Sequence, residues 1–395
     1  MPDNTNQPRE YDAVLGGQAR PPVDGLVLGG IESVKRGLNS LSEETQIASL
    51  YQALKYEEAG LEIIILALNS KSKKLKLYAY NILQNRRERN VTEVLKNYSH
   101  YQFFECLSTI NQHLAWVKSV VISPNGQTLV SGSGDKTIKI WDLKTKEKIC
   151  IRTHNFDYPT SLAISPDGQT FVSGSGNNII QVWKLDTGRE IFTLKGHEDS
   201  VYALAIAPDG RTLFSGSWKC LKVWNLETGK EIYTLRRHPS WVRGIAISPN
   251  GRNFVSSGDD KIIRIWDLYT DKELNILTGH LSHVSSIAIS PDGQTLISGS
   301  WGSIKLWDFH KRCEIHTFRA HSSWVRAIAI SPDGKIAFSA GDDNTIRIWD
   351  LQTKQEINTL IGHSGSVYSL ALSPDGQTLI SGSQDKTIKI WSIPE

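Results

Sequence analysis

Short apolar runs recur along the chain from about residue 103 to its end, and turn residues separate them. In the first complete unit, VVIS ends at Ser123 and leads into Pro-Asn-Gly, a hairpin signal because Asn and Gly tolerate positive φ. TLVSGS then starts at Thr128, and TIKIWDL starts at Thr137. In the next unit, a DTG turn leads into a further run, REIFTL, from Arg189. The pattern predicts repeated units of four short antiparallel strands.

Two residue types mark the repeat with near-constant spacing. Seven tryptophans stand 41 or 42 residues apart: Trp141, Trp183, Trp224, Trp266, Trp307, Trp349 and Trp391. A histidine precedes each of them by 27 to 29 residues: His113, His154, His197, His238, His280, His321 and His363. Because one four-stranded unit cannot bury both of its faces, neighbouring units must stack. We therefore expect an array of seven stacked units.

The order of these motifs resembles a known family. A histidine followed by SPDGQTL, SGS and DKTIKIWD is similar to the WD40 repeat, and the likeness covers about residues 103–395. Four units end in Trp-Asp, at Trp141, Trp266, Trp307 and Trp349. The resemblance implies an all-β, seven-bladed β-propeller, which we place at residues 101–395. A smaller all-α domain is expected before it, at residues 11–100.

The last unit has only three of its four strands, since the sequence stops at Glu395 shortly after Trp391. The segment 103–110, FFECLSTI, matches the fourth strand of other units, such as KEIYTL from Lys230. We therefore expect segment 103–110 to pair beside the last blade. This pairing would close the ring and remove the exposed strand edges that invite aggregation.

The repeated His, Ser, Asp and Trp could suggest catalysis, but the resemblance implies a buried hydrogen-bond network instead. The first serine of the SGS strand occurs in all seven units, and an aspartate stands six residues before the tryptophan in four of them. The network expected in these four units comprises His113, Ser131, Asp135 and Trp141; His238, Ser256, Asp260 and Trp266; His321, Ser339, Asp343 and Trp349; and His363, Ser381, Asp385 and Trp391.

Three blades depart from this network. Blade two has Asn177 at the acidic position, and blades three and five shorten the turn and carry Trp218 and Trp301 nearby. A charge-assisted hydrogen bond is roughly twice as strong as a neutral one. Blades three and five are therefore expected to be locally weaker, or to be held by another contact.

We expect no catalytic residue, no metal and no cofactor. A catalytic role for the repeated network would require several equivalent active sites around the ring. The four cysteines, Cys106, Cys150, Cys220 and Cys313, are far apart and form no CxxC pair, which favours a reducing cytoplasm. No run of the sequence reaches the length of a membrane span. These features favour a non-enzymatic cytoplasmic protein.

Aromatic and basic residues gather at one end of the predicted strands. In an antiparallel blade, the connection entering the first strand and the turn between the second and third strands lie at the same end. The candidate partner-binding residues there are Trp116, Lys118, Tyr202, Trp218, Trp241, Arg243, Trp301, Trp324, Arg326 and Tyr368. Trp, Tyr and Arg are enriched in interface hot spots, so we interpret this face as a docking site. Alternatively, the tryptophans pack against the next blade.

The first hundred residues differ from the rest. Residues 1–10 are predicted to be a disordered tail. From Ile31 to about Tyr98 apolar positions follow helical spacing, with Ser42 placed to cap one helix and Leu61–Leu68 predicting a buried one. Short helices with small connections suggest a HEAT-like array. This combination is similar to the helical segments of some bacterial, particularly cyanobacterial, WD proteins.

Two function hypotheses follow. The first is a non-enzymatic scaffold that binds a peptide or protein on the Trp- and Arg-rich propeller face. The alternative is a nucleic-acid-binding protein that uses the same face and a basic helix at 71–89. The basic residues of that segment are Lys71, Lys73, Lys74, Lys76, Arg86, Arg87 and Arg89, which could also form an ordinary solvated surface. The net charge of +3 does not by itself favour nucleic acid.

Overall fold

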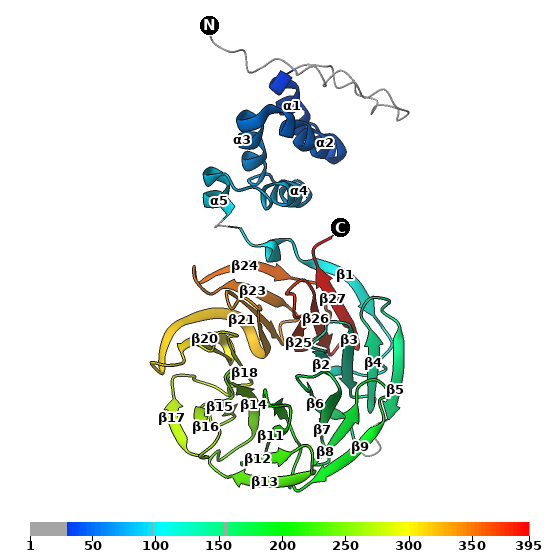
Figure 1. Cartoon of the computed structure of the whole chain (residues 1–395), viewed down its shortest axis with the longest axis vertical. Helices are drawn as coiled ribbons and strands as arrows, with labels where there is room; N and C mark the ends of the chain where they lie inside the picture. The colour runs from blue at the N-terminus through cyan, green and yellow to red at the C-terminus, as the bar shows by residue number, and fades with distance from the viewer. Residues whose placement is uncertain (1–29, 96–97, 154–156, 395) are drawn as a thin grey trace. The chain divides into compact units, whose positions relative to one another are not determined.

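The computed structural model describes residues 30–95, 98–153 and 157–394 of the 395-residue chain. The chain divides into two compact units, Met1–Phe103 and Phe104–Glu395, and each is described by itself (Figure 1). The tail predicted at residues 1–10 and the Gly- and Pro-rich segment that follows it, up to residue 29, lie outside the described residues.

The described part of the first unit is helical. Its elements are α1 (Gly30–Leu38), α2 (Glu43–Ala53), the 3₁₀ helix η2 (Leu54–Tyr56), α3 (Glu57–Ala67), α4 (Lys73–Leu83), α5 (Arg89–Leu95) and the 3₁₀ helix η3 (His100–Phe103). The Ser42 hydroxyl accepts a hydrogen bond from the backbone N–H of Thr45, and the Ser72 hydroxyl accepts one from Leu75. These bonds satisfy amide groups that a helix N-terminus leaves without a partner, so α2 and α4 each begin directly after the capping serine.

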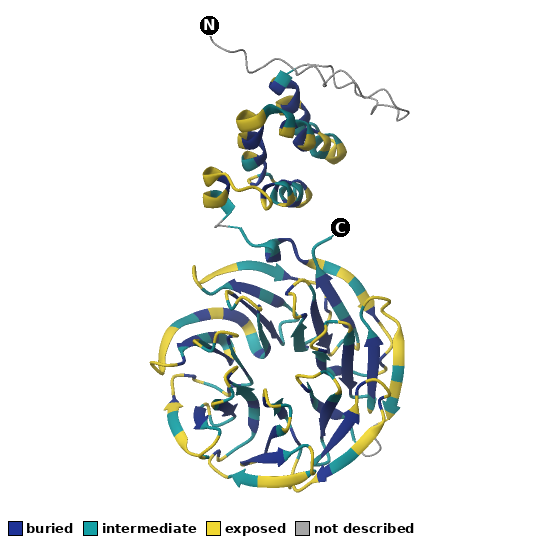
Figure 2. Ribbon diagram, viewed as in Figure 1, coloured by how far each residue is buried: buried dark blue, intermediate teal, exposed yellow. Residues whose placement is uncertain are grey.

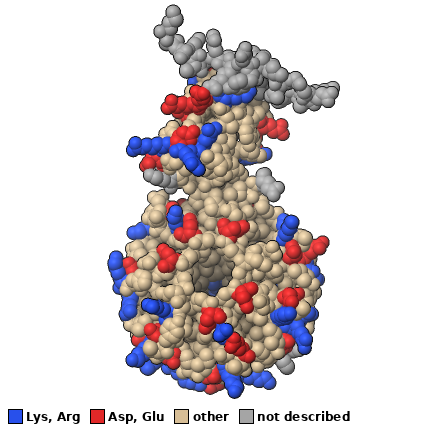
Figure 3. All heavy atoms as spheres, viewed as in Figure 1, with Lys and Arg blue, Asp and Glu red and all other residues tan. Residues whose placement is uncertain are grey.

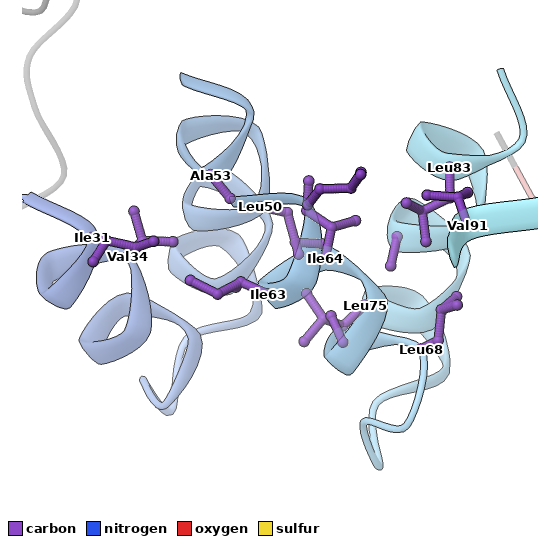
Figure 4. Close-up of a cluster of buried hydrophobic side chains, with 13 residues drawn as sticks. Ile31, Val34, Leu50, Ala53, Ile63, Ile64, Leu68, Leu75, Leu83 and Val91 are labelled. Carbon is purple, nitrogen blue, oxygen red and sulfur yellow. The ribbon is translucent and has the colours of Figure 1, made fainter. Parts of the chain in front are cut away.

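Apolar residues of the five α-helices form one core in this unit (Figure 4). Its fully buried members include Val34, Leu50, Ile64, Leu83 and Val91. The helical spacing of the apolar residues places one stripe of each helix against this core. The sequence of α3 predicts burial nearly all round, but Leu66 is 68% exposed. The helix is therefore buried over only part of its surface.

The basic segment 71–89 is not one helix, so that part of the nucleic-acid hypothesis is wrong. Helix α4 ends at Leu83, and α5 begins at Arg89. The intervening residues 84–88 are polar and exposed, so they offer no apolar side chain to the core that would hold them in a helix. Arg86 lies in this connection and forms an ion pair with Glu88 at 3.6 Å. The basic residues therefore do not share a single helical stripe.

The second unit is a ring of seven four-stranded blades, each running from the centre of the ring to the rim (Figure 1). The innermost strands of blades one to seven are β2 (Val117–Ile122), β6 (Pro159–Ile164), β10 (Ala203–Ile206), β14 (Val242–Ile247), β18 (Ser286–Ile289), the second part of β21 (Cys313–Ile330) and β25 (Val367–Leu372). The second strands are β3 (Thr128–Ser133), β7 (Thr170–Ser175), β11 (Thr212–Ser217), β15 (Asn253–Gly258), β19 (Thr295–Gly299), β22 (Ile336–Gly341) and β26 (Leu379–Ser383).

The outer half of each blade follows the same order. The third strands are β4 (Thr137–Asp142), β8 (Ile179–Lys184), β12 (Cys220–Asn225), β16 (Ile263–Asp267), β20 (Trp301–Asp308), β23 (Ile346–Asp350) and β27 (Ile388–Ser392). The outermost strands are β5 (Lys148–Thr153), β9 (Glu190–Lys195), β13 (Lys230–Leu235), β17 (Glu273–Leu277), the first part of β21, β24 (Gln355–Leu360) and β1 (Glu105–Ile110). Strand β21 serves two blades because it pairs first with β20 and then with β22.

Strand β1 completes the last blade. It pairs antiparallel with β27, with Glu105 opposite Ser392 and Ile110 opposite Ile388. The strand lies within segment 103–110, for which the sequence predicts this pairing. The predicted fold class, a seven-bladed propeller preceded by a smaller helical region, is confirmed.

Burial within a blade is greatest in the middle strands and falls toward the rim (Figure 2). Five of the six residues of β3 are buried, whereas four of the six residues of the outermost strand β5 are exposed. The repeat tryptophans fill the space between blades: Trp141 of blade one packs in a cluster with Ile388 and Ile390 of blade seven. Each blade therefore depends on its neighbour to bury its apolar face.

Candidate functional site

In four blades the repeated polar residues form a continuous hydrogen-bond chain. The histidine Nδ1 lies 2.9 Å from the carboxylate in His113–Asp135, His238–Asp260 and His321–Asp343, and 2.7 Å from it in His363–Asp385. Histidine Nε2 lies 2.7–2.8 Å from the hydroxyls of Ser131, Ser256, Ser339 and Ser381. The same hydroxyls accept a hydrogen bond from Nε1 of Trp141, Trp266, Trp349 and Trp391 at 2.8–2.9 Å.

The roles of the atoms follow from this geometry. An ionised carboxylate only accepts, so His321 Nδ1 carries the proton donated to Asp343, and its Nε2 accepts from Ser339. Burial alone would raise the pKa of the Asp343 carboxyl, but hydrogen bonds from His321 and Thr345 outweigh it and hold that pKa well below its ordinary value. The histidines and serines of this hydrogen-bond network are buried. Their polar groups are therefore used to hold the strands of the blade together.

The three departing blades behave differently from one another. In blade three the Cys220 thiol takes the place of the carboxylate, with its Sγ 3.4 Å from His197 Nδ1. In blade five His280 Nδ1 has no hydrogen-bond partner among the described residues. Burial, with a smaller effect of the nearby lysines, lowers the pKa of His197 to about 3 and of His280 to about 4. In blade two His154 lies outside the described residues, and Trp183 donates to Ser173 at 2.8 Å.

Three aromatic triads stand at the same end of the propeller, and each is named for the blade of its central tryptophan. The blade-one triad joins Trp116 to Tyr158 and Tyr368, with ring centroids 4.8 and 6.4 Å apart. The blade-four triad joins Trp241 to Tyr202 and Trp218 at 5.0 and 5.1 Å. The blade-six triad joins Trp324 to Trp301 and His283 at 5.1 and 5.2 Å.

Each triad crosses a boundary between blades, and two of them include the tryptophans of the shortened turns in blades three and five. Trp218 forms an isolated antiparallel bridge with Trp241, and Trp301 pairs with Trp324 across β20 and β21. Lys219 and Gly302 follow these tryptophans with positive φ, which permits the tight turn. The missing carboxylates are therefore offset by an edge-to-face contact with the next blade. Trp218 and Trp301 nevertheless keep 39% and 52% of their surface exposed.

One basic residue accompanies each triad, and all three line one central cavity of about 490 Å³. Lys118 Nζ lies 4.3 Å from the ring centroid of Tyr368. The Arg243 guanidinium lies 4.5 Å from the ring of Tyr202, and that of Arg326 lies 5.8 Å from the ring of Trp324. Figure 3 shows the hollow at the centre of the ring, and the innermost strands of all seven blades contribute to its wall. All ten candidate partner-binding residues belong to these three clusters, but only six of them line the cavity: Lys118, Tyr202, Arg243, Trp324, Arg326 and Tyr368. Trp116, Trp218, Trp241 and Trp301 contact the rings beside it and are not part of its wall.

Two further residues of this face were not among the candidates. Asp259 and Asp342 bind the two arginines in a bidentate manner, with Arg243 Nε and Nη2 each 2.9 Å from Asp259 oxygens and Arg326 Nη2 2.5 Å from Asp342. Both precede the network aspartate of their own blade by one position. An alignment of the seven units, read together with strand pairing, could have found them. His283 adds an exposed ring whose Nδ1 lies 3.4 Å from Asp259.

Among the described residues, no three His, Cys, Asp or Glu side chains gather as a metal-binding group. None of the described helices combines the length and apolar character needed to cross a membrane.

The fold agrees with comparisons to known proteins. Seven matches to the family described as WD domain, G-beta repeat, cover residues 104–142, 146–184, 188–225, 229–267, 271–308, 312–350 and 354–392. Nuclear distribution protein PAC1 of Scheffersomyces stipitis is 51% identical over 45 residues, which are 10% of this chain and 9% of that protein. Pre-mRNA-splicing factor prp46 of Emericella nidulans is 45% identical over 42 residues, 11% of this chain and 9% of that protein.

These matches are about one repeat long, so they span only about a tenth of the relatives. Both relatives are fungal, and they do not support the resemblance of the helical region to bacterial WD proteins. The seven successive family matches cover most of the propeller and agree with its seven blades. The chain therefore belongs to the WD40-repeat family.

Proposed function

We propose that this chain is a non-enzymatic scaffold that binds a peptide or protein through the three aromatic triads. The observation that carries the proposal is that each triad places at least one ring on the wall of one cavity, namely Tyr368, Tyr202 and Trp324, with a cation beside each triad. Aromatic rings with arginine at the centre of a surface are the composition of interface hot spots. The surrounding cavity is large enough to admit side chains of a partner.

The packing interpretation of the tryptophans accounts for only part of their surface. Trp241 and Trp324 are half-buried because each contacts a ring from the preceding blade. A purely structural tryptophan would be covered by its neighbours, as Trp141 and Trp266 are in the network. The exposed parts of Trp218 and Trp301 therefore favour a second role, as contact surface for a partner.

Charge favours a peptide or protein over nucleic acid. Arg243 and Arg326 are each paired with an aspartate of their own blade, so neither offers an uncompensated charge to phosphates. Binding of a nucleic-acid backbone depends on several such charges. Lys71 precedes α4, and the other basic residues of 71–89 are divided between α4, the connection that follows it and α5, so the continuous basic helix that the alternative required is missing.

The test compares wild-type protein with the double variant Trp241→Ala and Trp324→Ala. Peptides selected from a random library on the immobilised wild-type protein serve as probes, and fluorescence anisotropy measures their affinity. We expect the double variant to bind about 1000-fold more weakly, since hot-spot tryptophans contribute about 2 kcal/mol or more each and every 1.4 kcal/mol is about tenfold in affinity. Circular dichroism and thermal unfolding verify that the propeller remains folded.

Tyr269→Ala provides a matched control. Tyr269 is an aromatic residue that is 75% exposed, and it lies in the turn between the third and fourth strands of blade four, away from the triads. Its replacement is expected to leave peptide affinity unchanged. Equal affinity of the folded double variant and the wild type would overturn the proposed function.

A further inference from the structure

One of the three cations at the cavity lacks the carboxylate partner that the other two have. Arg243 and Arg326 form bidentate ion pairs with Asp259 and Asp342. No ion pair or hydrogen bond joins the Lys118 amine to any described residue, although that amine faces the ring of Tyr368. The lysine therefore holds its charge with only a cation–π contact.

The repeat explains why this partner is missing. The residue before the network aspartate is Asp259 in blade four and Asp342 in blade six, but it is Gly134 in blade one. In all three blades the backbone N–H of this residue donates to the carbonyl of the triad tryptophan, so the positions are equivalent. A Cβ at Gly134 would lie 2.5 Å from the Trp116 ring. The Trp116 indole occupies the space that an aspartate side chain at position 134 would need. Gly134 therefore leaves the Lys118 amine without a carboxylate partner.

The surroundings make the unpaired charge costly. Burial, and then the positive charges of Arg326 and Arg243, lower the pKa of the Lys118 amine to about 8. An anion placed beside Lys118 would stabilise the charged amine and so oppose both effects. Counting histidine as neutral, Lys118 has no carboxylate of its own, because Asp342, which acts on it in the opposite direction, is already paired with Arg326, and Asp259 is paired with Arg243. Three cations and two carboxylates, those of Asp259 and Asp342, are therefore gathered at the cavity. They leave one uncompensated positive charge, which matches a monoanion.

We infer that the cavity mouth is a subsite for one carboxylate of an acidic peptide, which Lys118 binds while the blade-one triad contacts the flanking residues. The inference rests on the proposed function and specifies the partner's chemistry. A carboxylate has the charge of one unit that the site lacks. A phosphate dianion, or the successive phosphates of a nucleic-acid backbone, would bring more negative charge than the site can balance. The amine is compact and can approach a single oxygen, as a carboxylate side chain requires.

The test uses peptides selected on the wild-type protein and synthesised with amidated C-termini, so that only Asp and Glu supply carboxylates. We expect one acidic position whose replacement by the corresponding amide weakens binding at least about tenfold. Lys118→Met should cause the same loss, and the amide peptide should bind this variant no more weakly than the acidic peptide does. A phosphoserine analogue that binds more tightly than the acidic peptide would overturn the assignment of a carboxylate, as would displacement by a single-stranded oligonucleotide.

The pH dependence gives a second readout. An anion binds the protonated amine, so affinity should fall roughly five- to tenfold between pH 7 and pH 9, across the Lys118 pKa of about 8. The other charged and titratable groups of the cavity are Arg243, Asp259, His283, Arg326, Asp342, Tyr202 and Tyr368. Lys118→Arg keeps all of them and stays charged at both pH values, so it should retain binding and lose the pH dependence.

Failure of this inference is distinguishable from failure of the proposed function. Binding that is lost in the double tryptophan variant but unchanged in Lys118→Met would leave the scaffold proposal standing and overturn the carboxylate subsite. A pH dependence that persists in Lys118→Arg would also overturn it. Binding that survives the double tryptophan substitution would overturn the proposed function itself.

Discussion

Replacing Ile110 with aspartate is expected to open the ring of blades and to lower the free energy of unfolding by about 4 kcal/mol or more. Ile110 is 7% exposed and packs in one cluster with Val117 and Ile388. A carboxylate there would be buried without a partner, so β1 would separate from β27. The free edge of β27 would then be open to pairing with other chains. Thermal unfolding and gel filtration should show a lower melting temperature and concentration-dependent association.

Leu107→Asp on the same strand is the control. Leu107 is 43% exposed and lies where the register of β1 shifts between Cys106 and Ser108. Its replacement is expected to change the free energy of unfolding by about 1 kcal/mol or less. If Ile110→Asp unfolds with the wild-type melting temperature and stays monomeric, β1 is not needed to close the propeller.

Replacing Asp343 with alanine is expected to cost about 3 kcal/mol of stability. The Asp343 carboxylate accepts hydrogen bonds from His321, from the backbone N–H of Ser322 and from both the backbone and the hydroxyl of Thr345. Alanine would leave these donors without their acceptor, and the donor group of His321 is buried, so water cannot replace the carboxylate there. Equilibrium unfolding in urea measures the difference.

Two comparisons make this expectation specific. Asp333→Ala removes an exposed turn carboxylate in the same blade and should cost about 1 kcal/mol or less. Because the pKa of Asp343 is lowered by folding, its contribution is present above the unfolded value of about 3.9 and is lost as the pH falls below it. The gap between wild type and Asp343→Ala should therefore shrink below about pH 4. An equal loss in both aspartate variants, or a gap independent of pH, would contradict the role assigned to the network.

The propeller could be predicted because its evidence is repeated seven times. Spacings of 41 or 42 residues, with a hairpin signal in each unit, leave little freedom in the number and order of strands. The hydrogen-bond chain was predictable for a related reason: a residue needed for local packing appears at the same position in each copy. The placement of Trp218 and Trp301 on one face followed from the antiparallel order of the strands, which puts the turn between the second and third strands at a known end of the blade.

The contacts between units were harder to foresee because they depend on which blade stands beside which residue. The triad of Trp116 draws Tyr158 from blade two and Tyr368 from blade seven, although these residues are 42 and 252 positions away. Cys220 replaces a carboxylate beside His197 only because the shortened turn brings the thiol within reach. Helix boundaries in 71–89 depended on which side chains found a core, and a count of basic residues does not reveal that.

The most direct test of the binding face observes its tryptophans while a peptide binds. The chain has twelve tryptophans: seven donate their indole N–H to a network serine, and five, Trp116, Trp218, Trp241, Trp301 and Trp324, belong to the triads. A ¹H–¹⁵N spectrum of the indole groups, recorded as a selected peptide is added, distinguishes the two sets. We expect signals of the triad tryptophans to shift while the seven network signals stay in place. Binding that leaves all five triad signals unchanged would contradict the account.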